Sequence, residues 1–327
     1  MRGSNSILAA AFCVLVAARL AADDAQLEAA KRAFEKGEYG AAVELLKSAS
    51  AKEPGNGDIH LWLTKSYLEM NQHDAAVSSA ERAVAIDPRS SVYHRWLGQA
   101  YGQKADHTSP LSALPLARKT QKEFQTAVQL DERNFDAVQD LIEFDCTAPS
   151  LVGGGEDKAQ PLIQKLLSLD PAEGHYGVAN CRAKKKDFAS ADAEFMIALE
   201  NKLKSPDRIY DIGDYFARRE QAEKLVAVAD AGQSQAPGDP RANYYRAVAW
   251  ILKGERLSEA EKFLRGYIQA APIRSTFPKL WHQHYWLGRL CEAQNNPRAA
   301  KDEYQAALKF NPKFKPAQDA LKKLDNP

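Results

Sequence analysis

Apolar residues recur along the chain with the spacing of amphipathic helices, and these helices come in pairs that repeat roughly every 34 residues. The clearest pair runs from Trp281 through Leu287 and Gly288 to Pro312, with small and aromatic residues at regular steps. The same spacing fits upstream, with a few insertions. Sustained alternation of apolar and polar residues, which is typical of β-strands, is missing from the sequence. The pattern therefore predicts an all-α chain built from consecutive helix pairs.

The helix pairs divide the chain into about eight predicted repeats and a final capping helix. Alanines recur where two helices of a pair are expected to cross closely, because a larger side chain would separate them. Two insertions interrupt the register: residues 104–116, predicted as a loop or a short extra helical turn, and residues 148–157, predicted as a loop. The repeats span residues 23–56, 57–90, 91–134, 135–171, 172–205, 206–239, 241–274 and 281–314, and the cap spans residues 315–324.

This spacing of small, aromatic and proline residues resembles that of the tetratricopeptide-repeat family over residues 23–324. The resemblance implies a right-handed superhelical solenoid of about eight helix pairs with a C-terminal capping helix. More loosely, residues 124–159, with the sequence Ala-Pro-Ser-Leu-Val-Gly-Gly-Gly-Glu-Asp-Lys-Ala, are similar to exported bacterial members of unassigned function. The motif is clearest in the second and eighth repeats, at Leu63, Tyr67, Ala76, Ala80, Ala83 and Pro88, and at Leu287, Gly288, Ala300, Tyr304, Ala307 and Pro312.

The first 22 residues have the layout of a secretory signal peptide. Arg2 gives a short positive start, residues 7–18 are almost entirely apolar, and Leu20-Ala21-Ala22 offers small residues before Asp23. The apolar run is short for a membrane span, which needs about 20 residues. We therefore expect cleavage after Ala22 and an exported protein, periplasmic or extracellular. An uncleaved membrane anchor is the alternative.

The charge balance is close to neutral. The whole chain has a formal charge of +1, and removal of residues 1–22, which hold two arginines and no acidic residue, makes it −1. A nucleic-acid binder or a protein that binds anionic membranes normally shows a basic excess. We therefore expect no nucleic-acid partner, and the sequence after Ala22 predicts no transmembrane span.

Three cysteines follow the predicted signal peptide: Cys146, Cys181 and Cys291. An odd number in an exported protein leaves at least one thiol over. Cys146 and Cys181 lie near the ends of the first helices of neighbouring repeats, so a disulfide is geometrically conceivable. Two buried free thiols are the preferred interpretation, with the disulfide as the alternative.

The sequence offers no catalytic, cofactor or metal signature. The glycines at 153–155 follow a helix and precede Glu156 and Asp157, which predicts an inter-helix loop and not a phosphate cradle. Equivalent positions in neighbouring repeats lie about 10 Å apart, too far for imidazoles to share a zinc ion. We therefore interpret the histidines at the fourth position of four repeats as packing residues with a polar tip: His60, His94, His175 and His284.

In the resembled family, the first helix of each repeat lines a concave groove. The fifth and ninth positions of these helices make the N-terminal half basic and place a tyrosine series and an arginine in the C-terminal half. The family's carboxylate clamp is matched only in part, because its paired asparagines are missing. The candidate partner-binding residues are Lys31, Lys65, Arg95, Tyr176, Tyr210, Tyr245, Tyr285 and Arg289.

Two functions fit these features. The favoured one is a non-catalytic scaffold that binds a peptide or protein segment in its groove. The alternative is a module that binds carbohydrate or a cell-envelope polymer, because tyrosine rings also stack on sugars. The sequence leaves the partner, the biological process and the oligomeric state open.

Overall fold

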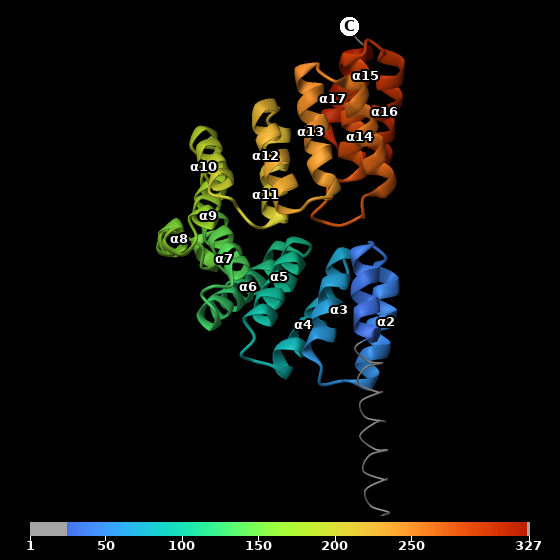
Figure 1. Ribbon diagram of the computed structural model, residues 1–327. Helices are drawn as coiled ribbons and strands as arrows, with labels where there is room; N and C mark the ends of the chain where they lie inside the picture. The colour runs from blue at the N-terminus through green and yellow to red at the C-terminus, as the bar shows by residue number, and fades with distance from the viewer. Residues whose placement is uncertain (1–24, 326–327) are drawn as a thin grey trace, which may run out of the picture. The chain divides into compact units, whose positions relative to one another are not determined.

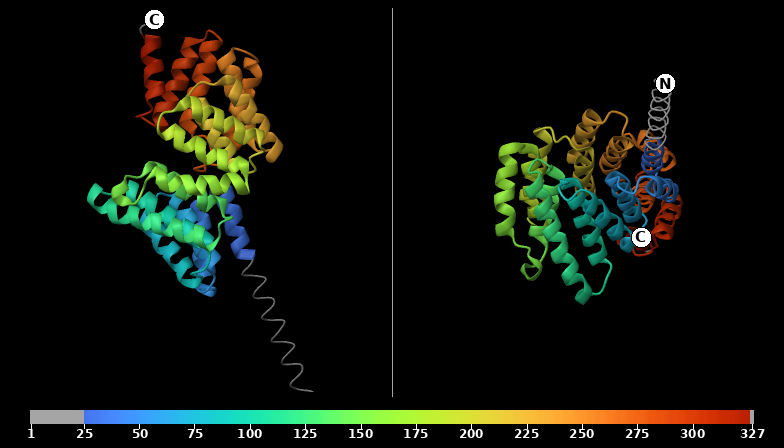
Figure 2. Two further views of the ribbon diagram at one scale, coloured as in Figure 1. Left: turned by 90° about the vertical axis from the view of Figure 1, so that its left-hand side faces the viewer. Right: turned by 90° about the horizontal axis from the view of Figure 1, so that it is seen from below.

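The computed structural model describes residues 25–325, in which every regular element is helical and no residue lies in a β-strand (Figure 1). The predicted all-α class is therefore confirmed. The predicted signal peptide lies outside the described residues. The chain divides into two compact units, one ending at Leu166 and the other beginning at Leu167. Figure 2 shows the helices of the two units from two further directions.

Consecutive helices pack against one another in each unit. Unit 1 contains a helix over residues 25–35, followed by α2 (Tyr39–Lys52), α3 (Gly57–Glu69), α4 (His73–Ile86), α5 (Ser91–Asp106), α6 (Pro110–Leu130), α7 (Phe135–Thr147), the 3-10 turn η1 (Ser150–Val152) and most of α8 (Glu156–Leu169), whose last three residues belong to unit 2. Unit 2 contains α9 (Pro171–Lys184), α10 (Phe188–Glu200), α11 (Pro206–Arg218), α12 (Ala222–Gln235), α13 (Pro240–Lys253), α14 (Leu257–Ala270), α15 (Leu280–Ala293), α16 (Pro297–Phe310) and α17 (Lys315–Asp325).

Proline and a short acidic residue mark where several helices begin. Helix α9 begins at Pro171 and α13 at Pro240, where the missing N–H of proline would have no partner within the helix. The side chains of Asp170 and Asp239 accept hydrogen bonds from backbone N–H groups of the same first turns. Local sequence therefore fixes the starts of these helices before any packing is considered.

Small residues let the two helices of a pair approach closely. Ala76, Ala191 and Ala300 are fully buried, at the positions where the sequence predicts close crossings. In the third and eighth repeats, a Cβ atom added to Gly98 or Gly288 would overlap an aromatic ring of the paired helix. A larger side chain at these positions would have to displace core residues.

The two insertions take different forms. Most of residues 104–116 is helical, because α5 extends to Asp106 and α6 begins at Pro110 and continues through Pro115. The helical alternative is therefore the one that the structure adopts. The second insertion forms η1 and the glycine loop, in which Gly153 has a φ of +104°. The amide of Gln121 on α6 donates to the Gly153 carbonyl oxygen at 2.6 Å, which fastens this loop to α6.

The C-terminal helix covers α16. Ala317 on α17 is fully buried, and Leu321 and Leu324 pack against the same cluster as Tyr304 and Ala307. A terminal helix of this kind shields the apolar side of the last pair. Among residues 25–325, no helix is long and apolar enough to span a bilayer.

Cys146 and Cys181 are both disulfide-bonded, whereas Cys291 is a free, buried thiol. The preferred interpretation of two free thiols at Cys146 and Cys181 is therefore wrong. Burial raises the pKa of the Cys291 thiol, so that it is a poor nucleophile at neutral pH.

Candidate functional site

The first helices of unit 1 bring three cations and two tryptophans together. Lys65 on α3 lies between two indole rings, with its Nζ 4.2 Å from the centroid of Trp62 and 4.9 Å from that of Trp96. Lys31, on the helix over residues 25–35, lies 5.9 Å from the Trp62 centroid, and Arg95 on α5 lies 5.2 Å from that of Trp96. We call these five residues the Lys–Trp face. Lys31, Lys65 and Arg95, which the sequence predicts as partner-binding residues, all belong to this face.

Two of the three cations already have carboxylate partners. Lys31 lies 2.7 Å from Glu28. Arg95 donates from Nε to Asp140 at 2.7 Å and from Nη1 to Asp136 at 3.1 Å. These ion pairs hold the side chains in place and reduce the charge that they can offer to a ligand.

Lys65 differs from its neighbours because its amine makes no hydrogen bond or ion pair within residues 25–325. Burial lowers the pKa of Lys65 to about 8, and the positive charge of Arg95 adds to the effect. An ammonium group that has lost much of its water gains more from an added carboxylate than an exposed one does. Among the residues of the Lys–Trp face, Lys65 is therefore the one that an anionic ligand group would contact most favourably.

Trp62 and Trp96 were missed by the sequence reasoning, which considered only the fifth and ninth helix positions. A usable signal was present. Both tryptophans occur in the pattern His-x-Trp-Leu, at His60 to Leu63 and at His94 to Leu97. Trp62 lies three residues before Lys65 on α3, so these two side chains share one face, and Trp96 occupies the equivalent position of α5.

The tyrosine series of unit 2 is mostly buried. Tyr210 and Tyr245 are each 1% exposed and Tyr176 is 8% exposed, whereas Tyr285 is half-buried. The expectation that all four rings face an open groove is therefore wrong for Tyr210 and Tyr245. The physical reason is glycine, because the Tyr245 ring lies against Gly213 and the Tyr210 ring lies against Gly232.

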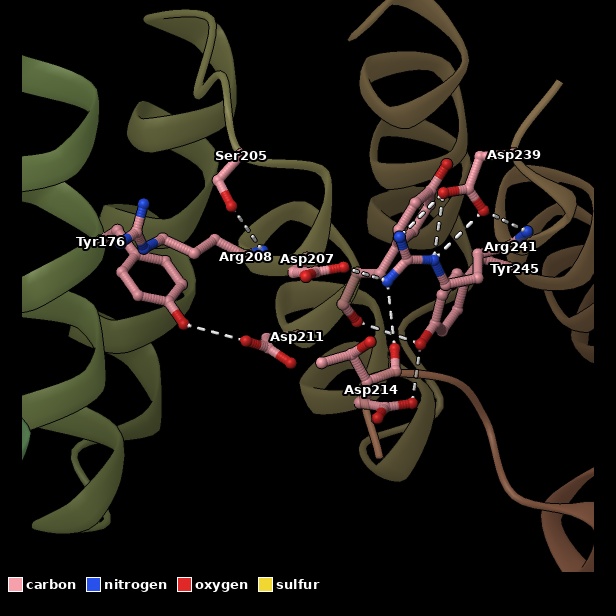
Figure 3. A network of polar contacts seen from close by, with 11 residues as sticks. Tyr176, Ser205, Asp207, Arg208, Asp211, Asp214, Asp239, Arg241 and Tyr245 are labelled. Carbon is pink, nitrogen blue, oxygen red and sulfur yellow. Dashed lines mark hydrogen bonds and ion pairs between the residues drawn. The ribbon is translucent and has the colours of Figure 1, made fainter. Parts of the chain in front are cut away.

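A polar network surrounds these tyrosines (Figure 3). Arg241, at the start of α13, donates from Nη1 to Asp207 at 2.6 Å and from Nη2 to Asp239 at 2.8 Å. Its guanidinium lies 4.3 Å from the ring centroids of both Tyr210 and Phe277. Since Arg241 is only 4% exposed and every nearby charge is paired, the network joins α11 to α13 and presents no open cation.

Tyr285 and Arg289 line a pocket of about 670 Å³ at the C-terminal end of unit 2. Arg289 Nη1 lies 2.5 Å from Glu220 and donates to the Tyr285 hydroxyl at 3.1 Å. Glu292 and Asp319 also line the pocket, so that acidic groups surround the arginine. Tyr285 and Arg289, both predicted as partner-binding residues, therefore lie side by side, and the sequence reasoning missed the acidic residues around them.

The histidines at the fourth repeat position have a regular partner that the sequence reasoning missed. In three repeats, the ring Nδ1 contacts a glutamate on the second helix of the same pair. In two of these the glutamate follows 19 residues later, and in the third it follows 29 residues later because of the insertion before α6. No group of three or more metal-ligating side chains occurs among the described residues. The pairs are His94–Glu123, His175–Glu194 and His284–Glu303.

Comparison with known proteins agrees with the helical pairs. Two family models, both described as tetratricopeptide repeat, match residues 33–100 and residues 284–314, and neither describes an enzyme. A search of curated proteins gave no significant match.

Solved structures of repeat proteins are similar in fold. A chain of the APC/C hetero-tetramer Cut9–Hcn1 matches with a TM-score of 0.50 and 12% identity, over 91% of this chain and 55% of that one. At this identity the likeness shows the fold alone. A thermophilic tetratricopeptide-repeat protein of Thermus thermophilus matches with a TM-score of 0.47 and 20% identity, over 57% and 94%. A tetratricopeptide-repeat protein of Parabacteroides merdae matches with a TM-score of 0.41 and 14% identity, over 93% and 99%.

Proposed function

We propose that this chain, which matches two tetratricopeptide-repeat models, is a non-catalytic scaffold that binds a peptide or protein segment through the Lys–Trp face. The observation that carries the proposal is the position of Lys65, an unpaired amine between Trp62 and Trp96. Tryptophan is among the residue types that contribute most at protein interfaces, so Trp62 and Trp96 supply the contact area and Lys65 supplies the charge.

The charges favour an acidic side chain at the centre of the bound segment. Lys31 and Arg95 are held by their own carboxylates, so the face has one uncompensated cation. A glutamate or aspartate that reaches Lys65 would form an ion pair between two indole rings, where water screens the attraction less than at an open surface. We therefore propose a partner segment with an acidic residue and apolar neighbours that cover the indole edges.

The carbohydrate alternative has less support. Tyr210 and Tyr245 are buried, and the rings of Trp62 and Trp96 already contact cations of the same face. A sugar would have to displace those cations before it could stack on the indoles. No observation in the described residues specifically favours a sugar ligand.

A library of synthetic peptides tests the proposal with defined ligands. Each peptide carries a central Glu, and a matched copy carries Gln. We expect the intact protein to retain a subset of the Glu peptides and to bind their Gln copies at least tenfold more weakly. Lys65→Met should remove the preference for Glu, whereas Lys122→Met on exposed α6 should keep it.

Three results would count against this function. One is equal binding of the Glu and Gln peptides, and another is equal loss of binding in the Lys65 and Lys122 variants. The third is retention on a glycan array without any peptide binding, which would restore the carbohydrate alternative.

We also propose export, on the basis of the N-terminal sequence. The short positive start, the apolar run and the small residues before Asp23 support a cleaved signal peptide. Expression in a bacterium followed by mass spectrometry of the envelope fraction should give a mature chain that begins at Asp23. An intact chain beginning at Met1 in the cytosolic fraction would exclude cleavage and export.

A further inference from the structure

One member of the histidine series lacks its glutamate. His60 on α3 occupies the same repeat position as His94, His175 and His284. In those three repeats the glutamate directly precedes the large aromatic residue that packs in the second helix, as Glu123 precedes Phe124. The equivalent residue in the second repeat is Ser79, which precedes Ala80. A serine side chain is too short to reproduce the carboxylate contact.

The structure leaves the His60 ring incompletely satisfied. His60 is only 3% exposed, and its Nδ1 atom is buried without a hydrogen-bond partner among the described residues. The backbone of Pro54 lies close enough to the ring to oppose part of the burial effect on its pKa. A buried polar atom without a hydrogen-bond partner lowers the free energy of unfolding, and such atoms are uncommon in folded proteins. The unpaired Nδ1 atom of His60 is therefore a candidate ligand contact.

An open space adjoins His60 where the other repeats hold a carboxylate. A pocket of about 260 Å³ is lined by His60 and Ser79 together with Lys47 and Arg82. A neighbouring pocket of about 590 Å³ shares His60, Lys47 and Arg82 and extends to Pro54. Helices α2, α3 and α4 therefore enclose a cavity with one buried unpaired nitrogen and two cations at its border.

The two cations differ in what they can offer. Lys47 is 3.0 Å from Glu44, the only acidic side chain that contacts it among the described residues. Arg82 is exposed and makes no ion pair within the described part of the chain. A negative group in the cavity would therefore meet an unpaired guanidinium as well as the histidine ring.

We propose that this cavity binds a carboxylate, which takes the place that Glu123, Glu194 and Glu303 occupy beside the other histidines. The carboxylate belongs either to a small molecule or to an acidic side chain of a protein, and both present the same group to His60 and Arg82. The site goes beyond the proposed function, because it uses α2 and α4 and none of the five residues of the Lys–Trp face.

The chemistry of the paired histidines indicates how the ligand is held. His94 contacts Glu123 through Nδ1 at 2.6 Å and the Pro88 carbonyl oxygen through Nε2 at 3.0 Å. Both partners are acceptors, so a ring with protons on both nitrogens satisfies them. A carboxylate beside His60 likewise accepts from an N–H at Nδ1, and it is attracted most strongly by a ring that is protonated on both nitrogens. Binding therefore favours the protonated ring.

Carboxylate affinity should consequently increase as the pH falls. Burial lowers the pKa of His60 below 6.5, which keeps the ring neutral in the empty cavity at pH 7.5. The charged or titratable groups that line the cavity or contact its cations are Lys47 and Glu44 on α2, Tyr67 on α3 and Arg82 on α4. Histidine is the side-chain type whose ordinary pKa places its change of charge between pH 5 and pH 8. His60 is then the group that gives the binding its pH dependence.

Nuclear magnetic resonance of the His60 ring tests the site directly. Sodium acetate, and in parallel sodium chloride at equal ionic strength, is added at pH 5.5 and pH 7.5, with the His60 signal assigned from a His60→Gln variant. We expect a saturable shift with acetate alone, tighter at pH 5.5, and a higher His60 pKa in its presence. A peptide with one Glu, compared with its Gln copy, distinguishes a protein side chain from a small carboxylate as the better ligand.

Two variants of the cavity and one control variant test the site further. Ser79→Glu restores the carboxylate of the other repeats and should abolish the acetate response, and it should raise the His60 pKa without added acetate. Arg82→Gln should weaken acetate binding at least fivefold, whereas Arg89→Gln, an exposed residue outside both pockets, should not. The proposal fails if neither acetate nor the Glu peptide shifts His60 beyond the chloride control, or if Arg82→Gln and Arg89→Gln respond alike. If Ser79→Glu does not fold, the Arg82 comparison still decides.

Discussion

The ring of Tyr245 stacks on the ring of Tyr210 with their centroids 5.7 Å apart and their planes at 12°. The Tyr245 hydroxyl donates to the Tyr210 carbonyl oxygen at 3.0 Å and to Asp214 at 2.7 Å. The Tyr210 hydroxyl is buried and has no hydrogen-bond partner among the described residues. Two rings in equivalent positions of neighbouring repeats therefore have similar packing and opposite hydrogen-bonding states.

This difference predicts opposite effects of removing the two hydroxyls. Tyr245→Phe should lower the free energy of unfolding by about 1 kcal/mol, because Asp214 and the Tyr210 carbonyl oxygen lose a donor. Tyr210→Phe should leave it unchanged or raise it, because the lost hydroxyl has no partner. Urea denaturation of the matched pair measures both. Equal destabilisation would mean that the Tyr210 hydroxyl is satisfied, for example by a buried water.

The tyrosines also show where the sequence pattern reaches its limit. The spacing of alanine, aromatic and proline residues correctly predicts helix pairs, because those residues act through local geometry and close crossings. The same spacing places Tyr210 and Tyr245 at a position that the family leaves to ligands. Their burial depends on Gly213 and Gly232, one helix away, which make room for each ring. A rule for single positions cannot include such a neighbour.

The sequence likewise predicts one part of the candidate site and not another. Lys31, Lys65 and Arg95 could be placed together from repeat register, since equivalent positions on stacked helices are neighbours. The sequence could not show that the Lys65 amine is unpaired and partly desolvated. That state depends on the two tryptophans beside it, and on the acidic residues that pair with Lys31 and Arg95 but not with Lys65. The histidine–glutamate pairs were in principle visible as a recurring step of 19 residues. To find these pairs, one has to compare residues of the first helix of each repeat with residues of its second helix.

Glycine substitutions test the close approach beneath Tyr245. A Cβ atom at Gly213 would lie 2.8 Å from ring atoms of Tyr245, and this ring also stacks on Tyr210. Gly213→Ala should therefore lower the free energy of unfolding by about 1–3 kcal/mol. A Cβ atom at Gly266 on α14 meets nothing within 4 Å. Gly266→Ala should therefore raise the free energy of unfolding by about 0.5–1 kcal/mol, because alanine has the higher helix propensity. Thermal unfolding followed by circular dichroism compares the two. Stabilisation by Gly213→Ala would show that the ring has room to move.

Cysteine chemistry gives a third test. Peptide mapping under non-reducing conditions should recover Cys146 and Cys181 only in disulfide-linked peptides. Cys291 should be alkylated only after unfolding, because it is a buried free thiol with a raised pKa. Alkylation of Cys146 and Cys181 in the unreduced, unfolded protein would contradict the disulfide state.

The last prediction concerns the pH dependence that Lys65 gives to stability. Its pKa in the folded protein is about 8, against 10.5 for the ordinary group, so between these values the unfolded chain binds a proton that the folded protein has lost. Stability therefore rises with pH in this window, because the unfolded state binds more protons. Below pH 8 both states are protonated, and the cost of the buried ammonium is present in full.

Lys65→Met removes this cost and should flatten the rise. Urea denaturation at intervals from pH 7 to pH 9.5 should show the wild type gaining stability relative to Lys65→Met, by at most about 2 kcal/mol and less where water screens the amine. The comparison stops at pH 9.5 because buried tyrosines, whose pKa values burial raises, lower stability at higher pH. Lys122→Met, at an exposed position, should follow the wild type throughout. Parallel curves for the wild type and Lys65→Met would show that the Lys65 amine is fully hydrated, and would remove the physical basis for its proposed role in binding an acidic residue.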